Sequence, residues 1–133
     1  MKLIICLDER CGMAFNGRRQ SRDRVLIADL AHHVGTSPLY VTPYSAALLA
    51  DAIPDLHVAE DPQSAATPDA WCFLETLAPD PTRLPDTLLI YRWNRHYPAD
   101  LAFSLPMDGY RLAETSDFIG SSHKKITKEV WTR

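Results

Sequence analysis

The stretch KLIICLD, residues 2–8, decides the fold that the sequence predicts. It is a short apolar run that ends at Asp8. Continuous apolar runs of this length are typical of strands that are buried on both faces of a parallel sheet. We therefore expect residues 2–7 to form a central strand, and residues 8–21 to form a polar loop after it.

The next segments predict alternating helices and strands. Ser21 is a favourable N-cap, and Gly35 is a natural stop for a helix with a buried stripe of Leu26, Leu30 and Val34. Thr42-Pro43 predicts the start of a second helix, which runs to about Ala52. We expect strands at 39–41, 56–59, 70–74 and 87–93, a loop at 60–69, and no regular helix in the proline-rich residues 78–86.

The end of the chain has a different pattern. Tyr110 to Phe118 and Ile126 to Trp131 alternate, with Gly120 and two serines between them, which predicts a terminal antiparallel hairpin. The expected fold class is therefore α/β. It is a mixed, mainly parallel sheet flanked by helices, with a C-terminal antiparallel hairpin, in a single domain of residues 1–133.

The composition is that of an ordinary globular protein. The chain has 133 residues, is 46% hydrophobic and carries a formal net charge of −3, so a polyanion surface would have to be a local patch. Its three cysteines have no spacing pattern that suggests a disulfide framework. The N-terminal apolar run is too short for a signal peptide, and no segment reaches transmembrane length. These features predict a cytoplasmic protein with no membrane partner, and they leave its oligomeric state open.

Three polar clusters, at residues 16–24, 92–97 and 120–125, lie in loops or at strand ends, where functional residues concentrate. Taken singly, each cluster is more simply explained as a solvated loop, and only their convergence would indicate a site. Their candidate ligand-binding residues are Asn16, Arg18, Arg19, Gln20, Ser21, Arg22 and Arg24 in the first cluster, Arg92, Asn94 and Arg95 in the second, and Ser121, Ser122 and Lys124 in the third.

His96 and His123 belong to these clusters and are the candidate catalytic acid–base residues. His32 and His33 lie near the end of the first predicted helix, where they complement its dipole. No His-x-His, Cys-x-x-Cys or His-x-x-x-His spacing occurs, so no metal site is expected. The glycine-rich phosphate loops and the Gly-x-Ser-x-Gly motif are also absent.

The order of the predicted elements resembles a shortened dihydrofolate reductase. That family opens with a buried strand, a loop containing Gly-Met and a helix, and it closes with an Asp-to-Phe loop and a hairpin led by Trp or Tyr. The matching segments here are Leu3–Leu7, Gly12-Met13, Ser21–Val34, Leu39–Ala52, Tyr97–Asp100, Phe103, Tyr110–Phe118, Gly120–Lys125 and Ile126–Arg133. The resemblance covers nearly the whole chain as topology, and it implies that the three polar clusters share one end of the sheet.

The functional residues of that family do not carry over. Its pterin-binding acid would fall at about Leu26, with Asp23 and Asp29 one turn to either side. Its Gly-Arg-x-Thr motif is replaced by Thr-Pro-Tyr-Ser at 42–45, and its Gly-Gly pair by Leu-Glu-Thr at 74–76, where a carboxylate would repel a phosphate. Folate reduction and a conventional NADP site are therefore in doubt, and the sequence leaves the cofactor unknown.

A second resemblance is to short bacterial proteins labelled ribonuclease Z. It rests on three segments, FNGRRQSRDRVLI, YRWNRHYPAD and GSSHKKIT. True ribonuclease Z has a metallo-β-lactamase fold and holds two zinc ions with a His-x-His-x-Asp-His motif. This chain lacks that motif and is too short for that fold, so the resemblance does not imply that chemistry.

Three functions remain open from the sequence. The leading hypothesis is a domain that binds, or also acts on, a small anionic molecule such as a nucleotide or a phosphorylated metabolite. The first alternative is an RNA-binding or RNA-cleaving protein, in which His96 and His123 form an acid–base pair beside the stacking surfaces of Trp93 and Tyr97. The second is a non-enzymatic interaction module, in which Asp8 and Asp23 pair with arginines and fix the polar loops.

Overall fold

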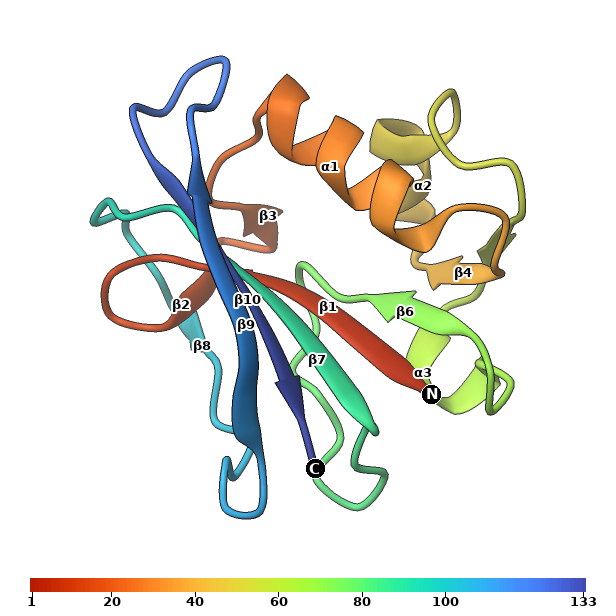
Figure 1. Ribbon diagram of the computed structural model, residues 1–133. Helices are drawn as coiled ribbons and strands as arrows, with labels where there is room; N and C mark the ends of the chain where they lie inside the picture. The colour runs from red at the N-terminus through yellow and green to blue at the C-terminus, as the bar shows by residue number, and fades with distance from the viewer.

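β1 (Lys2–Leu7) lies at the centre of a seven-stranded sheet in the computed structural model, which describes all 133 residues (Figure 1). The strand order is β5-β4-β6-β1-β7-β10-β9; the first five strands are parallel, and β10 and β9 are antiparallel additions. The other strands of this sheet are β4 (Leu39–Val41), β5 (Leu56–Val58), β6 (Trp71–Phe73), β7 (Thr87–Arg92), β9 (Arg111–Phe118) and β10 (Ile126–Thr132). The expected fold class is confirmed.

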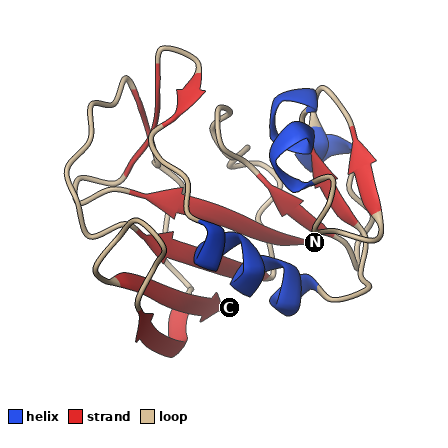
Figure 2. Ribbon diagram, turned by 90° about the horizontal axis from the view of Figure 1, so that it is seen from above, coloured by secondary structure: helices blue, strands red, loops and turns tan.

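Apolar side chains cover both faces of the sheet around β1. Leu3 and Ile5 pack into one core cluster and Ile4 into the other, and all three side chains are fully buried. The helix α1 (Arg24–Val34) contributes Leu26 and Leu30 to the same cluster as Ile4. Figure 2 shows α1 lying along one face of the sheet. Because β1 is buried on both faces, its continuous apolar sequence is the pattern that this position requires.

The two longest helices begin at capping side chains. The Thr42 hydroxyl accepts the backbone N–H of Ser45 at the start of α2 (Pro43–Leu49), as expected, although this helix ends earlier than residue 52. The expectation that Ser21 caps α1 is wrong: the cap is Asp23, whose carboxylate is bonded to the first turn. Gly35 ends α1 at a φ of 61°, a conformation that glycine adopts without strain. No helix has both the length and the apolar character needed to cross a membrane.

Two expected loops contain regular structure. Residues 8–21 hold β2 (Gly12–Phe15) and β3 (Arg18–Arg19), which form a small second sheet with β8 (Leu101–Ala102). Asn16 and Gly17 connect β2 and β3 with φ values of 54° and 71°, and an Asn-Gly pair favours this two-residue hairpin turn. Residues 60–69 contain α3 (Pro62–Ala65), a single turn whose cap is the Asp61 side chain.

Candidate functional site

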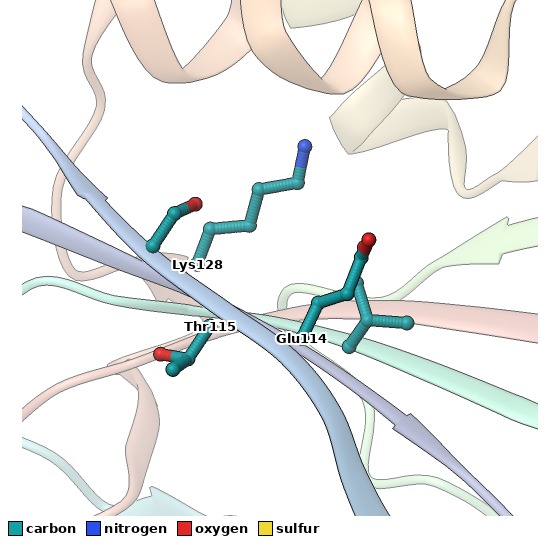
Figure 3. Close-up of a pocket in the computed structure, with 5 residues that line it drawn as sticks. Glu114, Thr115 and Lys128 are labelled. Atoms are coloured by element: carbon teal, nitrogen blue, oxygen red, sulfur yellow. The ribbon is translucent and has the colours of Figure 1, made fainter.

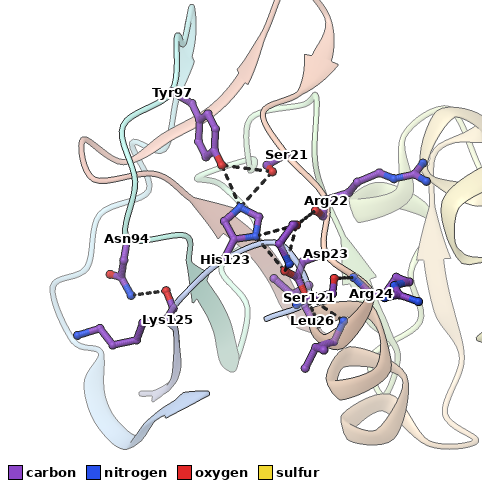
Figure 4. Close-up of polar contacts among 12 residues, drawn as sticks. Ser21, Arg22, Asp23, Arg24, Leu26, Asn94, Tyr97, Ser121, His123 and Lys125 are labelled. Carbon is purple, nitrogen blue, oxygen red and sulfur yellow. Dashed lines mark hydrogen bonds and ion pairs between the residues drawn. The ribbon is translucent and has the colours of Figure 1, made fainter. Parts of the chain in front are cut away.

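Asp23 joins the start of α1 to the loop between β9 and β10. Its Oδ1 accepts the backbone N–H groups of Val25 and Leu26 at 2.9 and 3.2 Å. The same carboxylate accepts the backbone N–H groups of Ser121 and Ser122, each at 2.9 Å (Figure 4). The residue is only 2% exposed, so these donors replace water around a buried charge. The first and third polar clusters therefore meet at one carboxylate.

His123 connects this carboxylate to the second cluster. Its Nδ1 lies 2.9 Å from Asp23 Oδ2, and its Nε2 lies 3.1 Å from Ser21 Oγ and 2.9 Å from the Tyr97 hydroxyl (Figure 4). The imidazole is stacked on Trp93 with the ring centres 4.6 Å apart, and the residue is 4% exposed. Both ring nitrogens of a buried histidine are thus engaged, by residues that come from all three clusters.

The charge of Asp23 determines how His123 is arranged. Burial by itself raises the pKa of Asp23, but hydrogen bonds from Ser122, His123, Ser121 and Leu26 outweigh it and hold this pKa well below its usual range. An ionised carboxylate can only accept hydrogen bonds, so Nδ1 of the imidazole carries the proton that it donates to Asp23. In the neutral ring, Nε2 is then an acceptor that faces two hydroxyl groups.

Arg22 and Arg24 project away from His123 on the other side of Asp23 (Figure 4). Both side chains are exposed, and neither forms an ion pair. They line an open groove of about 500 Å³ between α1 and α2. The other residues that line the groove are Asp23, Ile27, Ala47, Leu48, Ser121 and Ser122. The groove thus combines two unpaired cations, two hydroxyl groups and an apolar wall.

Arg19 is placed differently from the other arginines of its cluster. Its Nε and Nη2 lie 2.8 and 3.0 Å from the carboxylate oxygens of Glu75, and the Ser45 hydroxyl donates to Glu75 Oε1 at 2.7 Å. The guanidinium also lies over the ring of Tyr44. Burial would lower the pKa of Arg19, but the hydrogen bonds and charge of Glu75 outweigh it and raise this pKa. Arg19 is therefore part of a structural ion pair, and neither it nor the exposed Arg18 lines the groove.

Asp8 fixes the loop after β1 in the way that Asp23 fixes the start of α1. Its carboxylate accepts the backbone N–H groups of Arg10, Gly12 and Tyr97 and the side-chain amide of Gln20. Burial again opposes these bonds, which nevertheless lower the pKa of Asp8. The expectation that Asp8 and Asp23 pair with arginine side chains is therefore wrong, because both carboxylates are satisfied by other donors.

The first cluster also supplies the turn residue Asn16. Its backbone N–H donates to the Asp100 side chain at 3.1 Å, which ties the β2–β3 turn to the segment before β8. Its positive φ suits an asparagine. Asn16 is therefore placed in a structural turn and is not among the residues that line the groove.

The second cluster is divided between the sheet and a separate hollow. Arg92 Nε pairs with Glu129 Oε1 at 2.9 Å on the neighbouring strand. Asn94 donates its side-chain N–H to the Lys125 carbonyl and to Thr127 Oγ1, which closes the second cluster onto the third. Arg95 and Lys124 line a hollow of about 370 Å³ together with Trp93, Asn94 and Lys125.

His96 is exposed and makes no hydrogen bond, so only His123 of the two candidate catalytic histidines joins the network around Asp23.

The acids and the Gly-Gly position that the fold resemblance singles out do not fit the family's ligands. Asp29 accepts hydrogen bonds from the Tyr91 hydroxyl and from Lys128, and Asp23 is enclosed by its own donors, so neither carboxylate is free for a pterin. Glu75 stands at the end of β6, where the family has its Gly-Gly pair. A buried carboxylate at this position, bound to Arg19, would repel a phosphate. The residues therefore do not fit a conventional NADP site.

A further hollow of about 290 Å³ lies over β9 and β10 (Figure 3). It is lined by Glu114, Thr115, Ser116, Lys128 and Val130. The ammonium group of Lys128, the cation of this hollow, lies 2.9 Å from Asp29 on α1 and is already paired. This hollow therefore offers a ligand less unpaired charge than the groove beside α1.

Comparison with known proteins supports the fold and does not identify the function. No family model matches the sequence, and no curated protein matches it either. Among solved structures, the chain is similar to dihydrofolate reductase from Enterococcus faecalis complexed with NADP(H) and RAB-propyl, with a TM-score of 0.68 and 9% identity. The match covers 99% of this chain and 95% of that one. The protein therefore has a dihydrofolate reductase-like fold.

The same comparisons show no likeness to ribonuclease Z. No group of three or more His, Cys, Asp or Glu side chains is arranged so that it could hold a metal ion. A shared fold does not fix a function, which depends on the side chains of the site.

Sequence reasoning overlooked three residues that build the site. The sequence places Ser21 at the cap and Asp23 beside arginines, although Asp is as favourable an N-cap as Ser. Tyr97 was considered only as a stacking surface, and nothing in the sequence places its hydroxyl on His123. Glu75 was noted only as a misfit for a phosphate, and its pairing with Arg19, 56 residues away in the chain, has no local signal.

Proposed function

We propose that this protein binds a small anionic molecule, of the nucleotide or phosphorylated-metabolite class, in the groove beside α1. The observation that carries the proposal is the pair of exposed arginines, Arg22 and Arg24, which have no carboxylate partner and line the same groove. In an acidic chain, two unpaired guanidinium groups beside two hydroxyl groups favour a phosphate or carboxylate ligand.

The Ser121 hydroxyl complements the arginines, whereas the Ser122 hydroxyl is already bonded to the Arg22 carbonyl and the Asp23 carboxylate. Ser121 Oγ accepts the backbone N–H of Arg24 at 3.0 Å, which leaves its own proton available for a ligand oxygen. Asp23 also lines the groove, but its charge is already compensated by the surrounding donors. Because Asp23 and Ser121 occupy the free N–H groups at the start of α1, the arginine side chains supply the positive charge.

The apolar wall sets the kind of anion that fits. Ile27 comes from α1, and Ala47 and Leu48 come from α2, so the groove offers apolar surface as well as the arginines. A volume of about 500 Å³ lies within the range of small-molecule sites. An anion with an apolar or aromatic part, such as a mononucleotide, contacts both the arginines and the apolar wall, whereas inorganic phosphate contacts only the arginines.

Isothermal titration of a panel of mononucleotides and sugar phosphates tests this proposal. We expect at least one compound to bind the wild type, and the double variant Arg22→Ala/Arg24→Ala to weaken that binding by about 100-fold or more, since each charge-assisted contact contributes about 1.5–3 kcal/mol. The control Arg10→Ala/Arg111→Ala makes the same change in net charge with exposed arginines outside the groove.

Three results would contradict the proposal. The first is the absence of heat with every compound. The second is an equal loss of binding in both double variants, which would indicate a general effect of net charge. The third is a loss that occurs in Arg95→Ala/Lys124→Ala and not in Arg22→Ala/Arg24→Ala, because it would move the ligand to the hollow beside Trp93.

A further inference from the structure

We propose that Ser21 is the nucleophile of an acyl-transfer centre and that the protein hydrolyses small esters. The proposal rests on the chain of contacts from Ser21 Oγ to His123 Nε2 at 3.1 Å, and from His123 Nδ1 to Asp23 Oδ2 at 2.9 Å (Figure 4). A hydroxyl, an imidazole and a carboxylate in this order form a serine–histidine–aspartate triad, which is recognised by geometry and roles and not by sequence order.

The charge of Asp23 sets the arrangement that the chemistry needs when the imidazole is neutral. Asp23 is ionised and fixes the tautomer in which Nδ1 carries the proton, so Nε2 is a base directed at the Ser21 hydroxyl. Stacking on Trp93 holds the ring in this orientation. Asp23 does not touch the substrate and acts as a positioning residue, whereas Ser21 and His123 carry out the proton transfer and the attack.

Tyr97 adds a second hydroxyl to the triad. Its oxygen lies 2.9 Å from His123 Nε2 and 3.4 Å from Ser21 Oγ. When Nε2 takes the proton of Ser21, the Tyr97 hydroxyl can donate to Ser21 Oγ instead. The backbone N–H of Arg22, the residue after the nucleophile, donates to no other group of the protein. We assign this N–H to the developing oxyanion, since the residue after a nucleophilic serine often supplies such a donor.

The reaction is a two-step hydrolysis without a redox change. Ser21 Oγ forms a bond to the carbonyl carbon of the ester, its proton passes to His123 Nε2, and that proton goes to the alcohol oxygen as the carbon–oxygen bond to the leaving group breaks. Water then attacks the acyl carbon and gives a proton to Nε2. The bond to Ser21 breaks, and this proton returns to Ser21 Oγ. The products are one carboxylic acid and one alcohol.

The space around Ser21 sets the side from which an ester approaches it. Ser21 is half-buried and lines a narrow, mostly apolar cavity of about 10 Å³ with Leu26, Phe73 and Trp93. That volume holds at most one water molecule, so the cavity does not admit an acyl group, and the ester has to reach Ser21 from the exposed side of this half-buried residue. The residues Arg22, Asp23, Ile27 and Leu48 line both this cavity and the basic groove, so the groove adjoins Ser21. The alcohol oxygen has to lie at His123 Nε2, and an alcohol part long enough to pass Asp23 would reach the arginines.

A negatively charged alcohol part is therefore the favoured leaving group. This part of the inference rests on the proposed function, because it uses the unpaired Arg22 and Arg24. The nucleophile itself does not depend on those arginines, and a neutral ester tests it separately.

Pre-steady-state kinetics with p-nitrophenyl acetate tests the nucleophile. We expect a burst of nitrophenolate of about one equivalent per chain, and intact-protein and peptide mass spectrometry that place one acetyl group on Ser21. Ser21→Ala removes the burst, whereas the control Ser104→Ala, at an exposed serine outside the cavity, retains it. Ser21→Ala deletes one half-buried hydroxyl, and its melting temperature shows whether the fold is retained.

Two results of this experiment would overturn the inference. One is the absence of a burst in the folded wild type. The other is an acetyl group on a lysine or another serine together with an unchanged burst in Ser21→Ala. If Ser21→Ala did not fold, the site of acetylation in the wild type would still decide between the two outcomes.

Asp23→Asn tests the positioning role. Asparagine also caps helices, but its amide can present either a donor or an acceptor to His123 and no longer fixes the tautomer. We expect the acylation rate at saturating ester to fall by about 10³-fold or more, while the ester concentration for half-maximal rate stays the same. A purely structural role would lower the melting temperature and leave the acylation rate of the folded protein unchanged, and that result would contradict the assignment.

The charge preference has its own experiment. Acetate esters of a neutral phenol and of a phenol that bears a phosphate group are compared in the wild type and in Arg22→Ala/Arg24→Ala. We expect the wild type to prefer the anionic ester by about tenfold or more and the double variant to lose this preference. Equal rates with both esters in the wild type would remove the charged alcohol from the inference, and an intact burst would show that the nucleophile stands.

Discussion

Asp23 and Glu75 are two buried carboxylates with different partners. Asp23 is surrounded by backbone N–H groups and by one imidazole, whereas Glu75 is bound to the Arg19 guanidinium and the Ser45 hydroxyl. The residues are 2% and 9% exposed. Both therefore depend on protein donors in place of water.

The difference shows how one basic cluster can serve two purposes. At Glu75 a guanidinium provides the compensation, so Arg19 is not available to a ligand. At Asp23 backbone groups provide it, so the neighbouring Arg22 and Arg24 stay unpaired and exposed. The Asp23 arrangement also leaves His123 Nε2 facing hydroxyl groups. A carboxylate satisfied by backbone donors thus keeps the nearby cations and the histidine free for function.

The largest expected effect comes from Asp23→Ala. This change removes the cap of α1, the partner of His123 and the anchor of the loop that contains Ser121 and Ser122. We expect the free energy of unfolding to fall by about 3–5 kcal/mol, since a cap contributes about 1 kcal/mol and loss of one partner of a buried pair costs more. Urea unfolding measures it, with the exposed Asp108→Ala as the control. A loss below about 1 kcal/mol would show that Asp23 does not organise the three loops.

The main sheet could be predicted from the sequence because its signals are local. The apolar run of β1 and the stripe of Leu26, Leu30 and Val34 each reflect the burial of one element. The alternation of β9 and β10 indicates the strands correctly, although β9 is exposed along nearly its whole length and β10 shows no alternating burial. The β2–β3 hairpin was also signalled, by Asn16-Gly17, but the surrounding charge favoured the expectation of a loop. The periodicity of a short segment therefore predicts its secondary structure when the whole segment packs in one kind of surrounding.

The site could not be predicted in the same way, because its contacts are distant in the chain. Ser21 and Asp23 are both favourable caps, and the choice between them depends on N–H donors about 100 residues later. Similarly, the sequence shows four arginines between residues 18 and 24 but not that Arg19 alone meets a carboxylate. Tertiary contacts decide which charges are structural and which remain available to a ligand.

A second, smaller effect is expected at Glu75. Arg19→Ala leaves the buried carboxylate of Glu75 with only the Ser45 hydroxyl as a partner. We expect the free energy of unfolding to fall by about 2–3 kcal/mol. This is less than for a fully buried pair, because the Arg19 side chain is 18% exposed. A double-mutant cycle with Glu75→Gln measures the coupling, for which we expect about 1–2 kcal/mol. Ligand binding in the groove should not change. If Arg19→Ala abolished binding without destabilising the protein, Arg19 would belong to the ligand site after all.

The smallest expected effect is the acid dependence of stability. The pKa values of Asp8 and Asp23 lie below their usual range in the folded protein, because the N–H donors around them outweigh their burial. The stabilisation is therefore complete above the unfolded pKa of about 3.9 and is lost as the pH falls from there toward the folded values. Each carboxylate contributes a slope of up to about 1.4 kcal/mol per pH unit in that window.

Urea unfolding between pH 2 and pH 7 measures this slope in the wild type, Asp8→Asn, Asp23→Asn and the double variant. Each single change should reduce the slope, and the double variant should be the least sensitive to acid, although Asp29, whose pKa is also lowered, keeps part of the slope. Because each Asn variant is compared with itself at pH 7, the constant loss from its missing contacts cancels. If the Asp23→Asn slope equalled that of the wild type, the pKa of Asp23 would be the same in the folded and unfolded states. The surrounding donors would then not favour the ionised carboxylate, and the contrast with Glu75 would rest on hydrogen-bond geometry alone.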